Sequence, residues 1–496
     1  MTLLTRDPKL FSQGNYDLII VGGGIYGVML SLEAIRRDLR VLMIEKGDFI
    51  NATSLNHLRT VHGGLRYLQS LDIPRFMESV GERKWFLKYF PQFVNPMACL
   101  MPLYNKGIQR DWIMRVALLL NDILSFSRNS GIQTNSHLPH GRVISAAATT
   151  ELFHAVDSHH LKGSAVWYDA SIQEFQRLLM SVIKLAVSSE ARFLNYMEVK
   201  ELVKTQTGIA GVVAIDREDG EGYQFNAPVV INAAGPWCRD IAAAFDRDYF
   251  PLFKKRLLLW NVLFNREALS TAALALTPER GKGRAYFFHP WKNRLLVGTG
   301  ELIVEKSNRE TLVPAQEMEL FIANINKMAP GLNLTQQDIQ RVYSGILPAN
   351  ENGTLSKREV ILNHQSKGGP KGLYSVSGVK FTTSRLVAEK TLDQIFPCSP
   401  KKSYDDLMTQ VEKDTFTCHY DWQPTTAEDL QPLKEIIQKE CVNHLGDLVL
   451  RRTSLGDHPE RARRILPQLK PLFNWEEEKW QNEVQLLEKE LNASYI

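Results

Sequence analysis

Cysteine is scarce in this sequence of 496 residues. The five cysteines are scattered, odd in number and never spaced as Cys-x-x-Cys. They are Cys99, Cys238, Cys398, Cys418 and Cys441. A disulfide framework needs paired cysteines and a zinc site needs closely spaced ligands, so we expect neither, and we predict no metal site. The pattern favours the reducing environment of the cytoplasm.

Long apolar runs are also missing. No 18 consecutive residues are apolar, so no membrane-spanning helix is expected, and the first residues lack the apolar core of a signal peptide. A large excess of charge of one sign is missing too, because 59 Lys and Arg stand against 55 Asp and Glu, and the net charge is +4. This excess is too weak to indicate nucleic-acid binding, but it permits contact with an anionic membrane surface or an anionic substrate.

The sequence does contain a dinucleotide-binding pattern at residues 16–46. A short apolar run precedes Gly22, Gly24 and Gly27, which have the spacing Gly-x-Gly-x-x-Gly, and a helical pattern and a second apolar run follow. In such a turn the glycines allow the tight bend, the approach of a pyrophosphate and the packing of helix on strand. Glu45, 23 residues after Gly22, is placed to accept hydrogen bonds from ribose hydroxyls. The alternative is a βαβ turn that binds no nucleotide.

The order of the predicted elements indicates an α/β protein with three parts. The first is a Rossmann-like domain over residues 15–240 plus 364–396, which is discontinuous and carries a helical insert near 75–130. Residues 241–363 contain strand-like segments separated by turn residues, and we expect an antiparallel substrate sheet there. Residues 397–496 are expected to form a linker and a short C-terminal all-α cap.

The segment 111–126 has the pattern of an amphipathic helix with flanking arginines. Its apolar positions are Trp112, Ile113, Val116, Leu119, Leu120, Ile123 and Leu124. One interpretation is a helix whose apolar face packs into the core. The other is a helix that lies in a membrane interface, with its apolar face in the lipid.

Further motifs follow the glycine turn along the chain. They are Asp48-Phe49 with Ala52-Thr53-Ser54, HGGLRYL at 62–68, NAAGPW at 232–237 and KFTT at 380–383. Together with the turn, they resemble the FAD-dependent (aerobic) glycerol-3-phosphate dehydrogenase family, within the D-amino-acid-oxidase-like class of flavoproteins. The resemblance covers residues 15–395, and HGGLRYL is its most specific part. Arg451-Arg452-Thr453 fits the C-terminal helical cap of that family.

The resemblance implies a non-covalently bound FAD that takes a hydride from an alcohol carbon at flavin N5. The cofactor-binding residues that it implies are Gly22, Gly24, Gly27, Glu45, Thr53, Ser54, Val199, Ala234, Gly235, Gly345, Gly378, Lys380 and Thr382. Among them, Thr53 and Ser54 would meet the phosphates or the flavin edge, and Val199 would meet the adenine through its backbone. Lys380 and Thr382 would approach the flavin ring.

At the substrate end the resemblance implies His62, Arg66, Tyr67 and Lys380. Oxidation of an alcohol needs a group that takes the hydroxyl proton, and His62 or Lys380 is the candidate base. Arg66 and Lys380 are candidates for holding a phosphate. His289, on a predicted strand of the substrate sheet, is a weaker candidate base.

Leu347 marks the main departure from the family pattern. Residues 345–348 read Gly-Ile-Leu-Pro where the family has Gly-x-Arg-Pro, and that arginine often binds the phosphate or carboxylate of the substrate. Its loss should weaken anion binding on the order of 2–5 kcal/mol unless another cation compensates. Lys254, Lys255 and Arg256 are the candidate replacements.

The departure at Leu347 leaves more than one function open. The main hypothesis is oxidation of a CH–OH group as in glycerol-3-phosphate dehydrogenase. The alternatives are the same flavin chemistry on a bulkier or unphosphorylated alcohol or sugar, an FAD-binding protein without turnover, and an NAD-dependent dehydrogenase. We expect a small-molecule alcohol as substrate and quinone or oxygen as electron acceptor. The expected location is the cytoplasm, with peripheral contact at the inner face of the cytoplasmic membrane left open.

Overall fold

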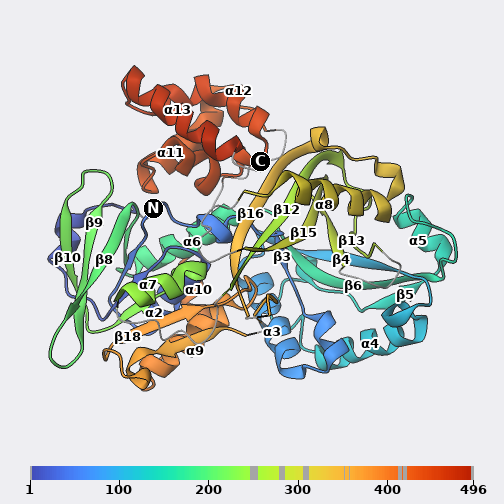
Figure 1. The fold of residues 1–496 in the computed structure, drawn as a ribbon, viewed down its shortest axis with the longest axis horizontal. Helices are drawn as coiled ribbons and strands as arrows, with labels where there is room; N and C mark the ends of the chain where they lie inside the picture. Colours follow the sequence, from blue (N-terminus) through green and yellow to red (C-terminus); the bar gives the residue numbers. More distant parts are fainter. Residues whose placement is uncertain are drawn as a thin grey trace.

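The chain folds into two large sheets with their helices and a helical domain at the C-terminus (Figure 1). The computed structural model describes residues 3–245, 255–278, 285–304, 312–350, 352–356, 358–411, 416 and 422–492. In Figure 1 the larger sheet extends to the right, the dinucleotide-type sheet lies at lower left, and the C-terminal helices stand at the top. This arrangement confirms the predicted α/β class with its all-α cap.

The predicted dinucleotide sheet has six strands. Their order is β17 (Val360–Asn363), β18 (Leu373–Ser377), β11 (Val230–Asn232), β1 (Leu18–Val21), β2 (Val41–Ile44) and β7 (Arg192–Leu194). Neighbours pair in parallel, except that β17 pairs antiparallel with β18. All residues of β1 and β2 are buried, because both faces of the sheet are covered.

Different layers cover the two faces of this sheet. Helices on one face are α2 (Ile25–Ile35), α6 (Phe175–Ser188) and α9 (Ser384–Ile395). Strands on the other are β8 (Met197–Lys204), β9 (Ile209–Asp216) and β10 (Gly222–Asn226), which form an antiparallel sheet. Ile20 of β1 joins the core of the helical layer, and Ile19 joins the core of the strand layer.

The larger sheet has nine strands. Their order is β16 (Ile339–Ala349), β12 (Lys255–Glu267), β15 (Arg294–Val304), β14 (Tyr286–Trp291), β13 (Ala273–Leu276), β4 (Val94–Leu103), β6 (Gly163–Ile172) and β3 (Thr60–Val61), with β5 (Arg142–Ile144) paired to β6. All pairs are antiparallel except β13 with β4. Helix α8 (Ala315–Met328) contributes Met318 and Phe321 to the core that contains Trp260.

The substrate sheet extends beyond the predicted range of 241–363. Strands β3 to β6 come from the part of the chain that the prediction gave to the dinucleotide domain and its insert near 75–130. Strand β17 shows the opposite error, because it forms the edge of the dinucleotide sheet. Both boundaries were wrong because pairing between distant strands leaves no local pattern, and β4, which contains Pro96 and Pro102, does not alternate between polar and apolar residues.

The remaining helices connect these sheets or form the cap. They are α1 (Pro8–Ser12), α3 (Ile73–Tyr89), α4 (Asp111–Leu124), α5 (Ala146–Leu152), α7 (Cys238–Phe245), α10 (Tyr404–Met408), α11 (Ala427–Lys439), α12 (Pro459–Leu469) and α13 (Glu477–Asn492). The last three pack around a π-helical turn (Asp447–Arg452) with a core of their own.

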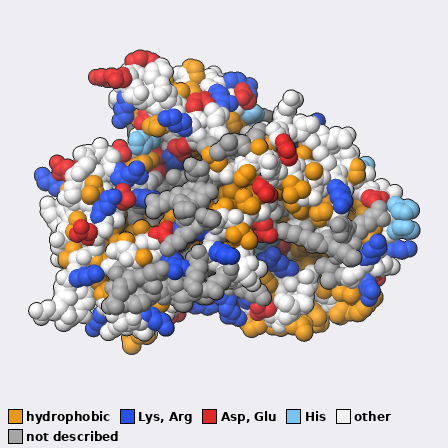
Figure 2. Space-filling view, in the orientation of Figure 1, with side chains coloured by type: hydrophobic (Ala, Val, Ile, Leu, Met, Phe, Trp, Pro, Cys, Tyr) orange, Lys and Arg blue, Asp and Glu red, His pale blue; other side chains and the backbone are white. Residues whose placement is uncertain are grey.

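Helix α4 does not bury the apolar face that its sequence carries. Trp112 is 62% exposed, Leu119 61% and Ile123 58%, while only Met114 and Leu118 of the helix are buried. Figure 2 shows hydrophobic side chains at the lower edge of the molecule in the region of α4. The core-facing interpretation of this face was therefore wrong. Within the described residues, no helix has the length and apolar character needed to cross a membrane.

Candidate active site

The turn between β1 and α2 has the geometry that its glycine spacing predicts. Gly22 has a φ of +114°, a value that other residues rarely adopt. A Cβ atom on Gly27 would lie 1.9 Å from the carbonyl oxygen of Gly22, so only glycine allows this packing. Gly24 is the N-cap of α2 and has no side chain to cap the helix, so the N–H groups of the first turn beyond Ile25 can meet an anion.

Glu45 closes this turn from the neighbouring strand. Its carboxylate accepts the N–H of Gly23 at 2.6 Å and the N–H of Gly47 at 2.8 Å. Burial raises the pKa of Glu45 and outweighs these two donors, which lower it. Val199 is buried at an irregularity in β8, and the first residue of that strand, Met197, donates its N–H to the carbonyl of Glu45. The residues predicted for the adenosine end therefore lie together.

A second loop of small residues packs against the glycine turn. A Cβ atom on Gly22 would lie 2.7 Å from the carbonyl oxygen of Ala233 and 3.2 Å from Cα of Ala234. Gly235 follows with a φ of +55°, and the hydroxyl of Ser377 donates to its carbonyl at 3.0 Å. Ala234 and Gly235 therefore lie beside the turn, and their predicted contact with the cofactor stays a prediction.

Thr53 and Ser54 connect the glycine turn to the substrate sheet. The hydroxyl of Ser54 accepts the N–H of Ile25, the first residue of α2, at 2.9 Å. The hydroxyl of Thr53 donates to the carbonyl of Ile346 at 2.7 Å. A Cβ atom on Gly345 would lie 3.1 Å from Cα of Thr53, so β16 passes close to this segment at its glycine.

Leu347 lies on the face of β16 that meets Thr53. In the ladder with β12, Gly345 pairs with Leu259 and Leu347 pairs with Leu257. Side chains two residues apart share a face of a strand, so Leu347 and Leu257 lie on the side of Gly345. Position 347, which is arginine in the family pattern, is thus apolar. It lies on the face of β16 that is directed at Thr53.

The residues predicted to replace the missing arginine do not share one location. Arg256 pairs with Pro348 in the ladder, so it lies on the opposite face, and it forms an ion pair with Asp240. Lys255 shares the face of Leu347 and is exposed. Lys254 lies outside the described residues.

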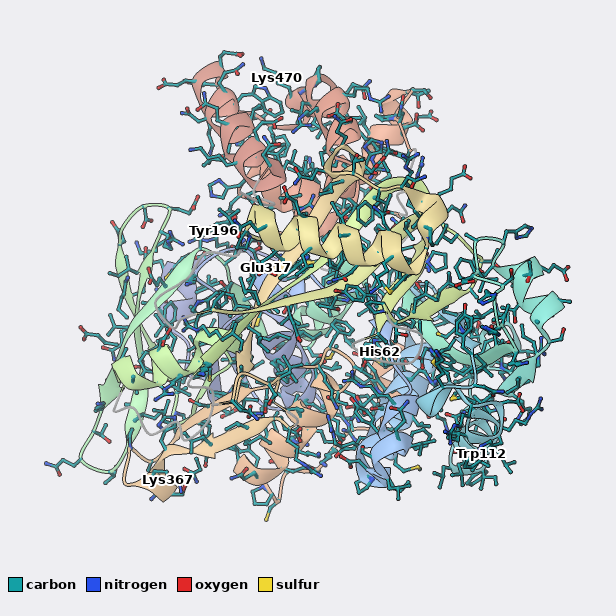
Figure 3. The ribbon with its side chains drawn as sticks, turned by 45° about the vertical axis from the view of Figure 1, so that its right-hand side comes forward. His62, Trp112, Tyr196, Glu317, Lys367 and Lys470 are labelled. Atoms are coloured by element: carbon teal, nitrogen blue, oxygen red, sulfur yellow. The ribbon has the colours of Figure 1, made fainter. Side chains whose placement is uncertain are left out.

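His62 lies near the middle of the molecule in Figure 3, and its side chain is half exposed. Its backbone N–H donates to the hydroxyl of Thr382 at 3.2 Å, and its Nδ1 lies 3.6 Å from Oδ2 of Asp169. Asp169 also accepts the N–H of Gly63 at 2.5 Å and a guanidinium N–H of Arg83 at 2.9 Å. Burial raises the pKa of Asp169, but the hydrogen bond from His62 and the charge of Arg83 outweigh it and lower the pKa to about 2. The carboxylate is therefore ionised at neutral pH.

Three cations surround the ring of Tyr67. The guanidinium of Arg66 lies 5.4 Å from the ring centroid, that of Arg75 4.4 Å and the ammonium of Lys380 4.5 Å. Burial raises the pKa of Tyr67, but the charges of Arg66 and Lys380 outweigh it and lower the pKa below its ordinary value. The predicted residues Arg66, Tyr67 and Lys380 therefore lie together, and Arg66 and Lys380 are cations that could meet an anion there.

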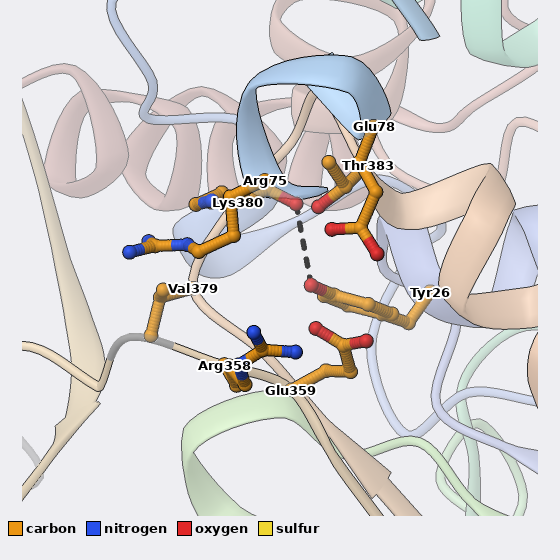
Figure 4. Close-up of a pocket in the computed structure, with 8 residues that line it drawn as sticks. All are labelled: Tyr26, Arg75, Glu78, Arg358, Glu359, Val379, Lys380 and Thr383. Carbon is orange, nitrogen blue, oxygen red and sulfur yellow. Dashed lines mark hydrogen bonds between the residues drawn. The ribbon is translucent and has the colours of Figure 1, made fainter. Parts of the chain in front are cut away.

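Arg75 and Lys380 lie together at the edge of a polar pocket (Figure 4). The residues that line it are Tyr26, Arg75, Glu78, Arg358, Glu359, Val379, Lys380 and Thr383. The hydroxyl of Tyr26 donates to the carbonyl of Lys380 at 3.2 Å, and a Cβ atom on Gly378 would lie 2.1 Å from that hydroxyl oxygen. The turn after β18 therefore packs on the start of α2. This contact joins Lys380, at the predicted substrate end, to the helix that follows the glycine turn, at the predicted cofactor end.

Asp169 and Arg75 were missed in the sequence. Asp169 lies on β6, far from His62 along the chain, so no local pattern connected the two residues. Arg75 lies on α3, outside the motifs of the sequence analysis.

His289 lies in the core of the substrate sheet. Its Nε2 is 2.9 Å from the hydroxyl of Ser171, and its Nδ1 is 3.1 Å from the carbonyl oxygen of Leu58. Because a carbonyl only accepts, Nδ1 carries the proton and Nε2 accepts from the serine. Burial lowers the pKa of His289 to about 4. A neutral ring with both nitrogens engaged fits a structural role.

Comparison with known proteins identifies the family. Residues 17–394 match the family model described as FAD dependent oxidoreductase. The chain belongs to the FAD-dependent oxidoreductases. FAD is its cofactor, and the alternative of an NAD-dependent dehydrogenase is dropped.

Relatives within this family agree with the resemblance in the motifs. A glycerol-3-phosphate dehydrogenase of Synechocystis sp. is 30% identical over 482 residues, which cover 92% of this chain and 83% of the relative. An aerobic glycerol-3-phosphate dehydrogenase of Staphylococcus aureus (strain USA300) is 28% identical over 391 residues, covering 78% of this chain and 68% of the relative. The chain is thus an FAD-dependent oxidoreductase that resembles glycerol-3-phosphate dehydrogenases.

Solved structures share the fold of this oxidoreductase. The glycerol-3-phosphate dehydrogenase of Bacillus halodurans complexed with FAD has a TM-score of 0.69 and 21% identity, and the match covers 98% of this chain and 96% of that one. The L-alpha-glycerophosphate oxidase of Mycoplasma pneumoniae with FAD bound has a TM-score of 0.57 and 15% identity, covering 79% and 98%. At these identities the likeness concerns the fold.

The residues at the glycine turn fit FAD. The turn offers glycine backbone, a helix N-terminus and a buried carboxylate, which are the groups that hold a diphosphate and a ribose. A second glycine turn at the end of β18 lies beside the proposed substrate residues.

Proposed function

We propose that the protein oxidises the secondary hydroxyl of glycerol 3-phosphate, or of a phosphorylated alcohol of similar size. The observation that carries this proposal is that His62, Arg66, Tyr67 and Lys380 lie together beside Thr382, which is predicted to bind the cofactor. The names of the relatives from Synechocystis and Staphylococcus aureus support the same substrate class.

Bound FAD supplies the acceptor for the hydride that leaves the alcohol carbon. We assign the diphosphate and ribose to the glycine turn with Glu45, and the adenine to the backbone near Val199. We assign Thr53 and Ser54, which bond to β16 and to the start of α2, to the part of the cofactor that faces the substrate sheet. We assign Thr382, whose hydroxyl accepts the N–H of His62, to the flavin end.

We assign the proton transfer to His62. As the hydride leaves, a base must take the hydroxyl proton, and a half-exposed imidazole at the substrate side can do so. The ionised carboxylate of Asp169 at 3.6 Å stabilises the positive charge that the ring then carries. Lys380 is the other candidate base, and its place beside Tyr67 fits an anion-binding role better.

The anionic end of the substrate is assigned to Arg66 and Lys380, with Arg75 as a third cation. All three lie around Tyr67, so a phosphate at this point meets more than one positive group. We infer that this cluster holds the anion without an arginine on β16, and that Arg75 of α3 is the cation outside the HGGLRYL motif.

A second candidate is the same chemistry on a bulkier or unphosphorylated alcohol. The observation that favours it is the apolar pair Leu347 and Leu257 on the face of the sheet directed at Thr53. A site with isobutyl groups there accepts a larger carbon skeleton.

Steady-state turnover with a dye as electron acceptor separates the two candidates. Purified protein is assayed with glycerol 3-phosphate, glycerol and a panel of unphosphorylated polyols and sugars. The first proposal expects kcat/KM for glycerol 3-phosphate to exceed that for glycerol by at least about 100-fold, because a charged pair across a binding site is worth several kcal/mol. A preference for an unphosphorylated alcohol would replace it with the second candidate.

We also propose peripheral contact with the cytoplasmic membrane through α4. Its exposed apolar face carries Trp112, Leu119 and Ile123, and Lys106 and Arg110 are exposed just before the helix. An interfacial helix has this combination of a lipid-facing stripe and nearby basic residues. A membrane quinone is then the proposed electron acceptor, and oxygen is the alternative, which a comparison of reoxidation rates with each acceptor decides.

A further inference from the structure

The loop after Glu45 is held by the C-terminal domain. Asp48, three positions further on, is fully buried, and Arg452 donates to both of its carboxylate oxygens at 2.6 Å and 2.9 Å. Arg451 adds a bond at 3.2 Å, and Asn195 donates to the same carboxylate at 2.9 Å. Burial raises the pKa of Asp48, but the charge of Arg452 outweighs it and the pKa is lowered. The loop and the cap are therefore joined by a buried pair of opposite charges.

Tyr196 makes a second connection between the same two parts. Its backbone N–H donates to the carbonyl of Gly47 at 2.8 Å, and its hydroxyl donates to Oδ1 of Asp447 in the C-terminal domain at 2.5 Å. Figure 3 shows Tyr196 just below the C-terminal helices. One side of this residue thus holds the loop, and the other side holds the cap.

The same loop determines the shape of the glycine turn. The carboxylate of Glu45 accepts the N–H of Gly23, and the N–H of Ile50 donates to the carbonyl of Gly23 at 2.9 Å. Residues on both sides of Asp48 therefore fix both polar groups of one glycine in the cofactor turn. A displacement of Asp48 would move these partners, because the peptide backbone between them is short.

We propose that the C-terminal helical domain acts as a clamp on the FAD site, and that Asp48, Arg452 and Tyr196 are positioning residues for the cofactor. The clamp touches the loop behind the predicted ribose and diphosphate end. Its failure would therefore lower the affinity for FAD. The proposal depends on the cofactor and not on the identity of the substrate.

Two tyrosines of the chain provide a matched pair of variants. Tyr196→Phe removes the hydroxyl that reaches Asp447, while Tyr343→Phe removes a hydroxyl that donates to Asp457 of the same domain at 2.7 Å. Tyr343 lies on β16 and has no hydrogen bond to the cofactor loop among the described residues. Both variants lose one hydrogen bond to a carboxylate of the cap, but only the first lies on the path to the glycine turn.

The dissociation constant of FAD is measured by titrating the full-length apoprotein with FAD and following flavin fluorescence. We expect Tyr196→Phe to raise this constant about tenfold, as the loss of a hydrogen bond to a charged group implies, and Tyr343→Phe to leave it within twofold. Asp48→Asn and Arg452→Lys should raise it further where the proteins fold. Equal dissociation constants for the two tyrosine variants would overturn the proposal.

Reciprocal coupling gives a second readout, independent of variant stability. If the cap favours FAD binding, bound FAD must favour the docked cap by the same factor. Hydrogen exchange in the turn Asp447–Arg452 should therefore slow when FAD is added to the wild-type apoprotein, and slow less in Tyr196→Phe. Exchange in this turn that does not respond to FAD in the wild type would also overturn the clamp.

Discussion

At the residue scale, the proposed chemistry depends on pairs rather than on single side chains. His62 faces the ionised carboxylate of Asp169, and Lys380 and Arg66 share the ring of Tyr67. Each pair joins a residue of the HGGLRYL segment to another side chain, and the partners Asp169 and Lys380 come from distant parts of the chain. The function of each residue in this centre is therefore testable by removing one member and keeping its partner.

His62→Gln tests the assignment of the base. The variant loses the group that takes the hydroxyl proton, so kcat should fall about 10²–10⁴-fold. The FAD absorbance spectrum should stay unchanged, because the side chain is not assigned to the cofactor. Stopped-flow reduction of the bound flavin measures the step directly.

His289→Gln is the matched control for this variant. The neutral ring of His289 is engaged at both nitrogens in the core, so its loss should lower thermal stability and leave the rate of flavin reduction within about threefold. A larger loss of rate in His289→Gln than in His62→Gln would move the base to His289.

Leu347→Arg tests the anion site. An arginine on this face of β16 would add a cation on the side of Thr53, so KM for glycerol 3-phosphate should fall about tenfold or more if the phosphate lies there. With unphosphorylated glycerol the same variant should show no gain, and this assay is its control. An unchanged KM for glycerol 3-phosphate would mean that position 347 lies out of reach of the phosphate.

At the element scale, local pattern was a reliable guide to helices and a poor one to strand partners. The helix after the glycine turn and helix α4 appear where their spacing predicts, because the pattern of each helix lies within a few turns of the chain. The sequence also identified the amphipathic pattern of α4, but not which surface its apolar face meets. That surface depends on the whole packing, which leaves the stripe exposed.

Helix α4 should bind anionic vesicles through this stripe. Leu119→Glu with Ile123→Glu places two charges on the lipid-facing side, and vesicle binding at low salt should fall at least about tenfold. Co-flotation with vesicles that contain phosphatidylglycerol measures it. Leu320→Glu on α8, where the leucine is 57% exposed, is the control and should bind like the wild type. Wild-type protein that does not float with these vesicles would contradict the membrane contact.

His444 should make the docking of the C-terminal domain depend on pH. Its Nδ1 lies 2.8 Å from Glu483 of α13, and its Nε2 lies 3.1 Å from Glu218 in the β9–β10 hairpin. The hydrogen bond that His444 donates to the carboxylate of Glu483 raises the pKa of His444 to about 9. Because this value is above the ~6.5 of an unfolded histidine, the stabilisation is complete below about pH 6.5 and is lost as the pH rises through about 9.

The melting temperature measured from pH 6 to pH 10 checks this expectation. The wild type should lose on the order of 1–2 kcal/mol of stability over that range from this group, and His444→Gln should flatten that part of the curve. Parallel curves for the two proteins would contradict the role of His444.

At the scale of the whole molecule, the family motifs predicted the chemistry better than the division into domains. The glycine turn, the loop at Ala234 and the turn at Gly378 meet at one site, because each follows a strand of the same sheet. The extent of the substrate sheet was not predictable, since β4 and β6 join it across long separations. The buried Asp48–Arg452 pair was equally hidden, because its two residues lie at opposite ends of the chain.

The most direct test of the proposed function is anaerobic reduction of the bound FAD by glycerol 3-phosphate. Bleaching of the long-wavelength flavin band needs no electron acceptor, so the measurement isolates the hydride transfer from the question of quinone or oxygen. We predict rapid and complete bleaching by glycerol 3-phosphate and little or none by glycerol at the same concentration. A flavin that stays oxidised with glycerol 3-phosphate but bleaches with an unphosphorylated alcohol would contradict the proposed substrate.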